Sequence, residues 1–234
     1  METSSGCFYL VATPIGNLED ITLRALRILK EADGVYAEDT RHTALLLNHY
    51  QIRRPLQSCH DHNEARRGEE IAGRVERGEK VALVSDAGSP GISDPGFRAV
   101  RACVDKGLRV EAIPGPCALI AGLSASGLST HEFHFAGFLP VKPGACEKRM
   151  RELLSLPGTL AIYESPYRII RTLKLMETLA PDRLVVVARE LTKKFEECRR
   201  DRPALLAAHF EAHPPKGEFV LLVAGEAEKT GEVD

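Results

Sequence analysis

The chain has 234 residues, 44% of them hydrophobic and 27% charged, which is the composition of a globular protein with one large domain or two smaller ones. The formal net charge of −2 gives no overall basic field that would by itself indicate nucleic acid as a partner. No apolar run approaches the roughly 18 residues of a membrane helix and no leader pattern opens the chain, so we expect a cytoplasmic protein without a membrane span.

The first half of the chain alternates short apolar runs with amphipathic helical patterns. The apolar runs predict strands over residues 7–12, 35–38, 81–85 and 109–114. The helical patterns cover residues 21–34, 44–50, 64–78, 97–107 and 116–128. Strands that are separated by single helices form parallel βαβ units, so we predict an open α/β sheet.

The second half has a different pattern, and the change places a domain boundary near residues 115–132. Strands are predicted over residues 131–140, 159–165, 183–190 and 219–225, with helices over 141–153 and 168–180. Residues 142–200 contain 13 Lys or Arg against 8 Asp or Glu. This surplus predicts either a basic face toward phosphates or an ordinary solvated helical surface.

The six cysteines are far apart, at irregular spacing, and none forms a C-x-x-C pair. Several lie in apolar runs, such as those around Cys7 and Cys117. We therefore expect buried free thiols in a reducing compartment, and neither disulfides nor metal ligands.

Three loops that carry glycine and proline follow predicted strands, at residues 13–17, 86–96 and 114–116. Ligands of open α/β sheets bind beyond the carboxyl ends of strands, so each loop is a candidate. The first lacks the G-x-G-x-x-G pattern of dinucleotide-binding proteins and is either a plain turn or a point of close ligand approach. The third precedes a helix of small residues, which serves either packing or a ligand.

The loop at 86–96 is the strongest candidate. Its eleven residues include three glycines, two prolines and two aspartates, whereas ordinary βα loops have about two to six residues. Glycines permit close approach of the backbone to a ligand, and prolines stiffen the loop. We therefore predict that this loop binds a ligand.

Several enzyme classes are disfavoured because their motifs are missing. The chain contains no P-loop pattern, no H-E-x-x-H and no G-x-S-x-G around a serine. His60 and His62 stand two residues apart in a polar segment, which is weak support for a metal site. Surface residues or RNA contacts are the better interpretation, and no metal is predicted.

An ordered set of segments resembles one known family. These segments are LVATPIGNLEDITLRA (10–25), AEDTRHT (37–43), SDAGSPGISDPG (85–96), IPGPCALIAGLSASGL (113–128), FAGFLP (135–140), YESPYR (163–168), ARELTK (188–193) and KGEFVLLVAG (216–225). With them the chain resembles the bacterial 16S rRNA (cytidine-2′-O)-methyltransferases of the tetrapyrrole methylase superfamily. The resemblance extends over roughly residues 7–225.

The resemblance implies a two-domain α/β fold of the tetrapyrrole methylase (class III methyltransferase) type. An open, mostly parallel sheet is expected in residues 1–117 and a mixed sheet in residues 118–234, with the cofactor cleft between the domains. The implied cofactor is S-adenosylmethionine, and the implied partners are 16S rRNA within the small ribosomal subunit and a second copy in a homodimer. The implied cofactor-binding residues are Pro14, Asp86, Gly88, Ser89, Pro90, Ile92, Cys117, Ala118, Tyr163, Glu164, Leu191, Thr192 and Glu218.

Methylation of a ribose hydroxyl benefits from a base that removes its proton. Candidate catalytic residues are Glu38, Asp39, Glu190 and Lys193, with Asp86 as a further carboxylate. A lysine serves as a base only where burial or nearby positive charge lowers its pKa. Candidate RNA contacts are Arg41, His60, His62, Arg168 and again Lys193.

Two other functions stay open at this point. The same fold also methylates tetrapyrroles and other small molecules, although those members often carry a glycine-rich first loop, where this chain has Thr13-Pro14-Ile15-Gly16-Asn17. A non-catalytic ribosome-binding protein that uses the pocket only as a scaffold or sensor is the alternative of another class.

Overall fold

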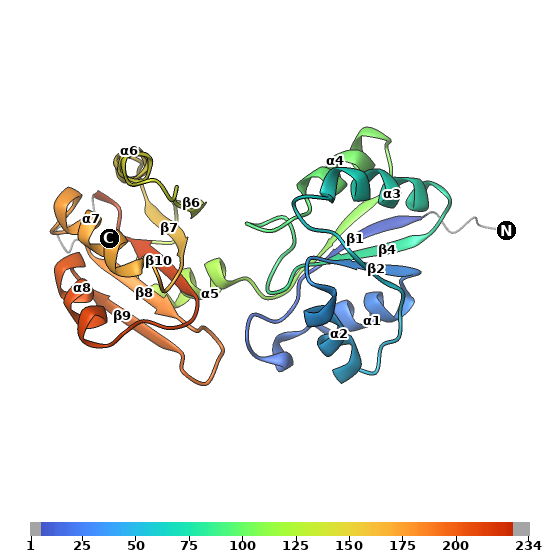
Figure 1. Cartoon of the computed structure of the whole chain (residues 1–234), viewed down its shortest axis with the longest axis horizontal. Coiled ribbons are helices and arrows are strands. Elements are labelled where there is room, and N and C mark those ends of the chain that lie inside the picture. Colours follow the sequence, from blue (N-terminus) through green and yellow to red (C-terminus); the bar gives the residue numbers. More distant parts are fainter. Residues whose placement is uncertain (1–5, 227–234) are drawn as a thin grey trace. The chain divides into compact units, whose positions relative to one another are not determined.

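The computed structural model describes residues 6–226, which form two compact units that divide between Cys117 and Ala118. Each unit contains one five-stranded sheet (Figure 1). The strands of the first unit are β1 (Cys7–Val11), β2 (Gly34–Ala37), β3 (Leu56–Ser58), β4 (Lys80–Val84) and β5 (Val110–Ile113). Its helices are the short 3₁₀ helix η1 (Leu18–Asp20) and α1 (Leu23–Glu31), α2 (Thr40–His49), α3 (Glu64–Glu76) and α4 (Phe97–Asp105).

The first sheet has the strand order β3-β2-β4-β1-β5, and all of its pairs are parallel. This confirms the parallel sheet predicted from strands that alternate with helices. Strand β3 was not predicted. Its three residues are only half-buried, so they do not form the apolar run that marks the other strands.

Both faces of this sheet are covered, because α1 and α2 lie on one side and α3 and α4 on the other (Figure 1). Successive residues of a strand point to opposite faces. In β1, Tyr9 packs with the α1 side, whereas Phe8 packs with the α3 side. Two-sided burial is the reason that these strands are continuous apolar runs rather than alternating ones.

The second unit contains α5 (Ala118–Ser126), β6 (Phe133–Phe138), α6 (Pro143–Leu154), β7 (Thr159–Glu164), α7 (Ile169–Leu179), β8 (Val185–Arg189), β9 (Glu197–Asp201), α8 (Pro203–Ala212) and β10 (Phe219–Val223). The strand order is β6-β7-β10-β8-β9. The β6–β7 pair is parallel and the other three pairs are antiparallel. The sheet is therefore mixed, as the resemblance implied.

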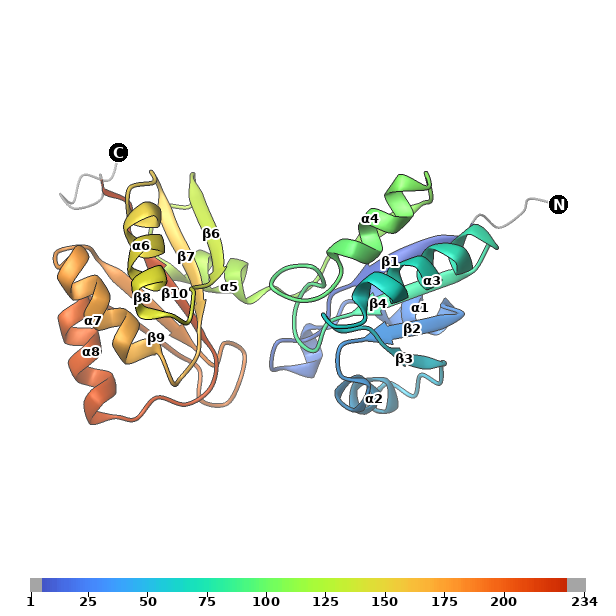
Figure 2. The same cartoon turned by 45° about the horizontal axis from the view of Figure 1, so that its top comes forward.

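Helices α6, α7 and α8 cover one face of the second sheet, where Met150, Leu173 and Phe210 join its buried core (Figure 2). Helix α5 lies on the other face. A Cβ atom added to Gly122 of α5 would stand 3.3 Å from Val220 of β10, so the missing side chain lets the helix approach the sheet closely.

Strand β9 and helix α8 were not predicted from the sequence. Strand β9 is an edge strand with Glu197, Arg199 and Arg200 among its five residues, so it lacks the apolar signal of a buried strand. Charged side chains on an edge strand also hinder pairing with another chain. Helix α8 is apolar on nearly every side, and its sequence therefore shows no clear helical period.

Within residues 6–226, none of the helices combines the length and the apolar character that a membrane span needs. The six cysteines are free thiols, four of which (Cys7, Cys59, Cys103 and Cys146) are buried.

Candidate functional site

The strand order creates a topological switch point between β1 and β4. From β1 the chain runs through α1 to β2, whereas from β4 it runs through α4 to β5, in the opposite direction across the sheet. Ligands of open α/β sheets bind beyond the carboxyl ends of the strands at such a point. The loops that leave β1 and β4, which the sequence singled out, start here.

The structure joins these two loops directly. Thr13 and Gly88 form an isolated antiparallel bridge, with the Thr13 amide donating to the Gly88 carbonyl at 2.9 Å and the Gly88 amide donating to the Thr13 carbonyl at 3.0 Å. The Thr13 hydroxyl donates to the carbonyl of Ser85 at 3.0 Å, and the Ser85 hydroxyl donates to the carbonyl of Gly88 at 2.9 Å. Gly88 has a φ of +85°, a conformation that favours glycine.

The third loop meets the same place. The Ser89 hydroxyl donates to the carbonyl of Pro116 at 3.4 Å, and a Cβ atom added to Gly88 would stand 3.7 Å from that carbonyl oxygen. All three loops that the sequence selected within the first unit therefore converge at the switch point. Of the predicted cofactor residues, Pro14 and Cys117 are half-buried, Pro90 is buried and Ile92 is exposed.

The far end of the 86–96 loop is anchored by a buried carboxylate. Glu64, at the start of α3, accepts hydrogen bonds from the amides of Gly96 at 2.7 Å and Arg98 at 2.9 Å. It thereby caps the amino end of α4, where helix amides have no other partner. No local sequence pattern marks Glu64 for this role, because its partners are more than 30 residues away along the chain.

Carboxyl groups gather beyond the ends of β2 and β4. Burial, followed by the neighbouring charges of Glu38 and Asp86, raises the pKa of Asp94 to about 7. Burial also raises the pKa of Glu38, with Asp86 as the next cause. Asp86 accepts a hydrogen bond from the Asp39 amide at 3.0 Å. Asp94 lies in the predicted loop but was not among the predicted site residues.

Asp39 and Arg41 form an ion pair with each other. Asp39 caps α2 by accepting from the Arg41 amide at 2.8 Å, and its side chain pairs with the Arg41 guanidinium at 2.9 Å. The hydrogen bonds from Arg41 hold the pKa of Asp39 down at about 2. A carboxylate with so low a pKa is a weak base near neutral pH, so the structure gives Asp39 little support as a proton acceptor.

His60 and His62 lie in the turn that follows β3, with ring centroids 5.9 Å apart. Asn63 contacts His60 Nε2 at 3.2 Å, whereas His60 Nδ1 is buried without a partner among the described residues. No group of three or more His, Cys, Asp or Glu side chains within residues 6–226 is arranged to hold a metal ion.

In the second unit, Tyr163 connects strand β7 to the start of α5. Its hydroxyl accepts a hydrogen bond from the Leu119 amide at 3.2 Å, next to the predicted cofactor residue Ala118. Its ring packs edge-on against Phe135, with 4.9 Å between the ring centroids. These contacts place Tyr163 beside Ala118, and both are predicted cofactor residues.

Glu164 is almost fully buried, and its contacts hold the fold of the second unit together. It pairs with Arg168 at 2.8 Å and accepts from the Thr172 hydroxyl at 2.7 Å and the Ser165 amide at 2.8 Å. Arg168 also donates to the carbonyl of Leu139 at 2.9 Å. The structure thus gives both predicted residues an internal role, and the guanidinium of Arg168 is already engaged.

Lys193, Glu190 and Glu218 form a network. The Lys193 ammonium lies 2.9 Å from Glu190 and 2.8 Å from Glu218, and the Glu218 amide donates to Glu190 at 3.1 Å. Although burial lowers it, the hydrogen bonds that the ammonium donates to the two carboxylates raise the pKa of Lys193 overall. This is opposite to the lowered pKa that a lysine base requires. The pKa of Glu190 is lowered by Lys193 against the effect of burial, which makes Glu190 a weaker base as well.

The segment after β8 has an unusual backbone. Glu190 and Thr192 have φ values of +51° and +66°, which non-glycine residues rarely adopt, and strain of this kind is concentrated at functional sites. Leu191 packs toward α5, where its Cδ1 atom would stand 3.6 Å from a Cβ atom added to Gly122. The predicted cofactor residues Leu191 and Thr192 therefore lie on a backbone that packing holds in a strained form.

The charges at the switch point restrict what it can bind. Glu38, Asp86 and Asp94 would repel a phosphate group, so a dinucleotide or nucleoside triphosphate is disfavoured. The same carboxyl groups would attract a ligand with net positive charge. A carboxyl with a pKa of about 7 is also suited to exchange a proton near neutral pH.

Comparisons with known proteins agree with this architecture. A family model described as Tetrapyrrole (Corrin/Porphyrin) Methylases matches residues 7–204. A solved structure of a cobalamin biosynthetic enzyme, cobalt precorrin-4 methyltransferase, superposes with a TM-score of 0.70 at 18% identity, covering 96% of this chain and 97% of that one. At this identity the likeness shows the fold alone.

Two curated relatives are much more similar in sequence. The chain is 45% identical over 238 residues to the Ribosomal RNA small subunit methyltransferase I of Pasteurella multocida, covering 100% of this chain and 85% of that protein. It is 49% identical over 226 residues to the protein of the same name from Mesorhizobium japonicum, covering 96% of this chain and 77% of that protein.

Proposed function

Because this chain belongs to the tetrapyrrole methylase family, and within it to the ribosomal RNA small subunit methyltransferases I, we propose that it methylates RNA of the small ribosomal subunit. The proposed reaction transfers a methyl group from S-adenosylmethionine to the 2′-hydroxyl of a cytidine in 16S rRNA. The observation that carries this proposal is the convergence of three loops at the switch point of the first sheet, beside a group of carboxyl side chains.

The residues at the switch point suit S-adenosylmethionine. That molecule has a positively charged sulfur and an ammonium group but no phosphate, so it complements Glu38, Asp86 and Asp94 electrostatically. The backbone around Gly88 is held in place by its bridge to Thr13, which offers a preorganised wall at low entropic cost. Ser89, Pro90 and Ile92 continue this wall along the loop.

S-adenosylmethionine, when bound, supplies an electrophilic methyl group on a cationic sulfur. The protein must then hold the ribose oxygen in line with that carbon, at about 3–3.5 Å, and accept the proton of the hydroxyl. Among the predicted bases, Glu38 keeps its support because its pKa is raised. Asp94 joins it, since a pKa of about 7 leaves the carboxylate populated at neutral pH while making it more basic than an ordinary aspartate.

The remaining assignments are part of the proposal. Tyr163, Leu191, Thr192 and Glu218 are proposed to contribute to cofactor binding from the second unit. His60 and His62 are proposed RNA contacts, because both lie on the surface segment that follows β3. A homodimer is expected from the family and is tested by light scattering of the purified chain.

The deciding experiment supplies labelled S-adenosylmethionine and small ribosomal subunits from a strain that lacks this gene. We expect label in 16S rRNA, and nuclease digestion followed by mass spectrometry is expected to give 2′-O-methylcytidine. Label on a base, or on tetrapyrroles alone, would contradict the proposed acceptor. If the cofactor-loaded protein binds subunits and labels no acceptor, the chain is a ribosome-binding protein and not an enzyme.

A further inference from the structure

A cavity of about 410 Å³ lies in the second unit, between the ends of β8 and α8. It is lined by Arg189, Glu197, His209, Phe210, His213, Pro214 and Lys216. Arg189 follows the core residues Val185 and Val187 at strand spacing, so it points to the face that α6, α7 and α8 cover. The cavity is thus on the opposite face of the sheet from α5 and from Leu191.

Positive charge predominates around this cavity. The carboxylate of Glu197 pairs with Arg189 at 3.1 Å and with Arg199, and it also lies 3.9 Å from His209. Glu211 of α8 cannot offset these cations, because it pairs with Lys174 at 2.5 Å. Within residues 6–226, Lys216 forms no ion pair. Of the Arg, Lys, Asp and Glu side chains that line the cavity, Arg189 and Lys216 are cationic and Glu197 is the one carboxylate.

One donor of Arg189 lacks an acceptor. Its terminal nitrogens contact Glu197 at 3.1 Å and the carbonyl of Lys216 at 3.5 Å, but its Nε–H is buried and has no partner in the described part of the chain. A buried donor without an acceptor is unfavourable, because it has lost its hydrogen bonds to water and gained none in return. An oxygen atom of a ligand in the cavity would satisfy it, and a guanidinium prefers the oxygens of a phosphate or carboxylate.

Two histidines extend the donor set. The rings of His209 and His213 stack with 4.6 Å between their centroids, and His213 Nδ1 lies 3.1 Å from the carbonyl of His209. Phe210 and Pro214 add apolar surface beside them. A cavity of this volume accommodates a nucleotide-sized group, not only a small ion.

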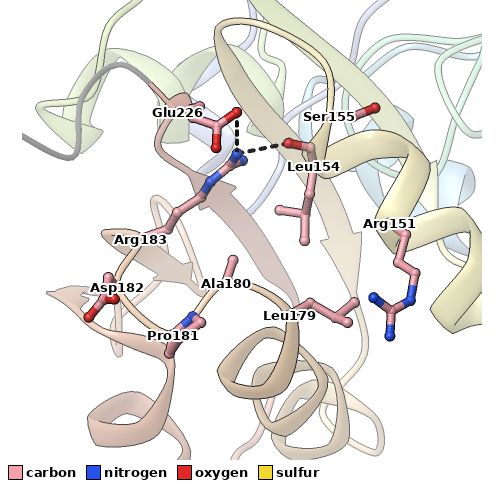
Figure 3. A pocket seen from close by; sticks show the side chains of 9 residues that line it. All are labelled: Arg151, Leu154, Ser155, Leu179, Ala180, Pro181, Asp182, Arg183 and Glu226. Atoms are coloured by element: carbon pink, nitrogen blue, oxygen red, sulfur yellow. Dashed lines mark hydrogen bonds and ion pairs between the residues drawn. The ribbon is translucent and has the colours of Figure 1, made fainter.

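A second cavity of the same unit serves as a comparison. It measures about 380 Å³, and the close view shows Arg183 between the Leu154 carbonyl and Glu226 (Figure 3). Its lining contains Arg151 and Arg183 but also the carboxylates of Asp182 and Glu226, so its formal charges balance. Arg183 donates to Leu154 at 2.8 Å and lies 3.9 Å from Glu226. The surplus of cations distinguishes the cavity at Arg189 from this one.

We propose that the cavity lined by Arg189, His209, His213 and Lys216 binds a backbone phosphate of the RNA substrate. This inference rests on the proposed function for the identity of the RNA. It adds a contact surface in the second unit, on the face of its sheet opposite to α5 and Leu191. The phosphate would accept from Arg189 and Lys216, and the nucleotide to which it belongs would lie against the exposed Pro214.

The test compares Lys216→Gln and Arg189→Gln with the wild type. Lys216 is exposed, so its replacement leaves the fold intact, and Arg189→Gln supplies the second variant. The matched control is Lys106→Gln, which removes the same charge from an exposed lysine near the end of α4 in the first unit. For each protein, binding to small ribosomal subunits is measured over a range of salt concentrations, and KM and kcat are measured for methyl transfer.

We expect Lys216→Gln to bind subunits about fivefold more weakly. In a plot of the logarithm of the binding constant against the logarithm of the salt concentration, the slope should be less steep by roughly 0.7 to 0.9, the value for one lost phosphate contact. KM for subunits rises by the same factor, while kcat and the affinity for S-adenosylmethionine stay within about twofold. Lys106→Gln follows the wild type. If both cavity variants match the wild type in KM and in salt slope, the phosphate site is refuted, whatever the reaction proves to be.

A second arm separates RNA from free phosphate. Inorganic phosphate replaces the subunits, with chloride at equal ionic strength as the control, and the imidazole resonances of His209 and His213 are followed by NMR. Shifts with inorganic phosphate, combined with unchanged subunit binding in the variants, would overturn the assignment to RNA. If the wild type transfers no methyl group but Lys216→Gln weakens subunit binding, the proposed reaction fails while the phosphate site stands.

Discussion

Replacing Asp94 with asparagine tests the electrostatics of the switch point. Folding raises the pKa of this carboxyl from an ordinary 3.8 to about 7, chiefly through burial. The folded state therefore holds the proton more tightly than the unfolded state does. Below about pH 4 the carboxyl is protonated in both states and costs no stability. As the pH rises from about 4 to about 7, the unfolded state releases its proton first, and the folded state is progressively destabilised.

The size of this effect follows from the shift. One pKa unit corresponds to 1.36 kcal/mol, so a shift of about three units sets an upper limit of about 4 kcal/mol. Asp94 is only half-buried, and solvent screening reduces the effect. We expect Asp94→Asn to be more stable than the wild type by about 1–2 kcal/mol at pH 8, with the difference decreasing toward pH 4.

Urea unfolding of both proteins between pH 4 and pH 8, followed by circular dichroism, measures this difference. Asp105→Asn is the matched control, because Asp105 is an exposed aspartate paired with Arg101 on α4, and its change is expected to stay within about 0.5 kcal/mol at every pH. A stability difference for Asp94→Asn that does not vary with pH would refute the argument.

The same variant tests catalysis. If Asp94 accepts the proton of the ribose hydroxyl, kcat falls by about 100-fold or more, while S-adenosylmethionine still binds. Retained kcat together with the predicted stability change would leave Glu38 as the candidate base.

Three further predictions concern other predicted residues. Gly88→Val is expected to weaken S-adenosylmethionine binding at least tenfold, as measured by calorimetry. The control Gly107→Val imposes similar backbone strain, at a φ of +65° and with no atom close to the added side chain, and should leave binding unchanged. Equal affinities of the two variants would show that the 86–96 loop is not part of the site. Glu164→Ala leaves the guanidinium of Arg168 without its carboxylate, so the free energy of unfolding in urea is expected to fall by about 3 kcal/mol. A variant that is as stable as the wild type but cannot bind the cofactor would contradict this structural role. Lys193→Arg keeps the ion pairs but cannot release a proton, so an unchanged kcat and pH profile are expected, and complete loss of activity would restore Lys193 as a base.

The sequence predicted well those strands, helices and loops whose pattern of apolar, glycine and proline residues is local. The buried strands of the first unit are short apolar runs because both faces are covered, and the 86–96 loop was conspicuous from its glycines and prolines. Strand β9 was not predicted, because a strand at the edge of the sheet can carry charged side chains. The role of Glu64 was not predicted, because its cap on α4 joins two segments that are distant in the sequence.

The sequence indicated which residues could serve in the candidate site, but it did not indicate their pKa values. Glu38 and Asp94 are 56 positions apart, yet the charge of Glu38 raises the pKa of Asp94. The pKa of Lys193 is raised because Glu218, 25 positions away, contacts its ammonium group. A pKa depends on burial and on neighbouring charges, and both arise only when distant segments pack together.

By itself, the sequence determined that this is an α/β protein with a long loop rich in glycine and proline after β4, because periodicity and turn residues act over a few neighbouring positions. It also carried the ordered segments of the family. Only the tertiary structure decided which side chains are available for chemistry. It brought Asp94 and Glu38 together at the switch point and engaged Arg168 with Glu164 inside the second unit. The cations around Arg189 also come from separate elements, so that cavity exists only in the folded chain.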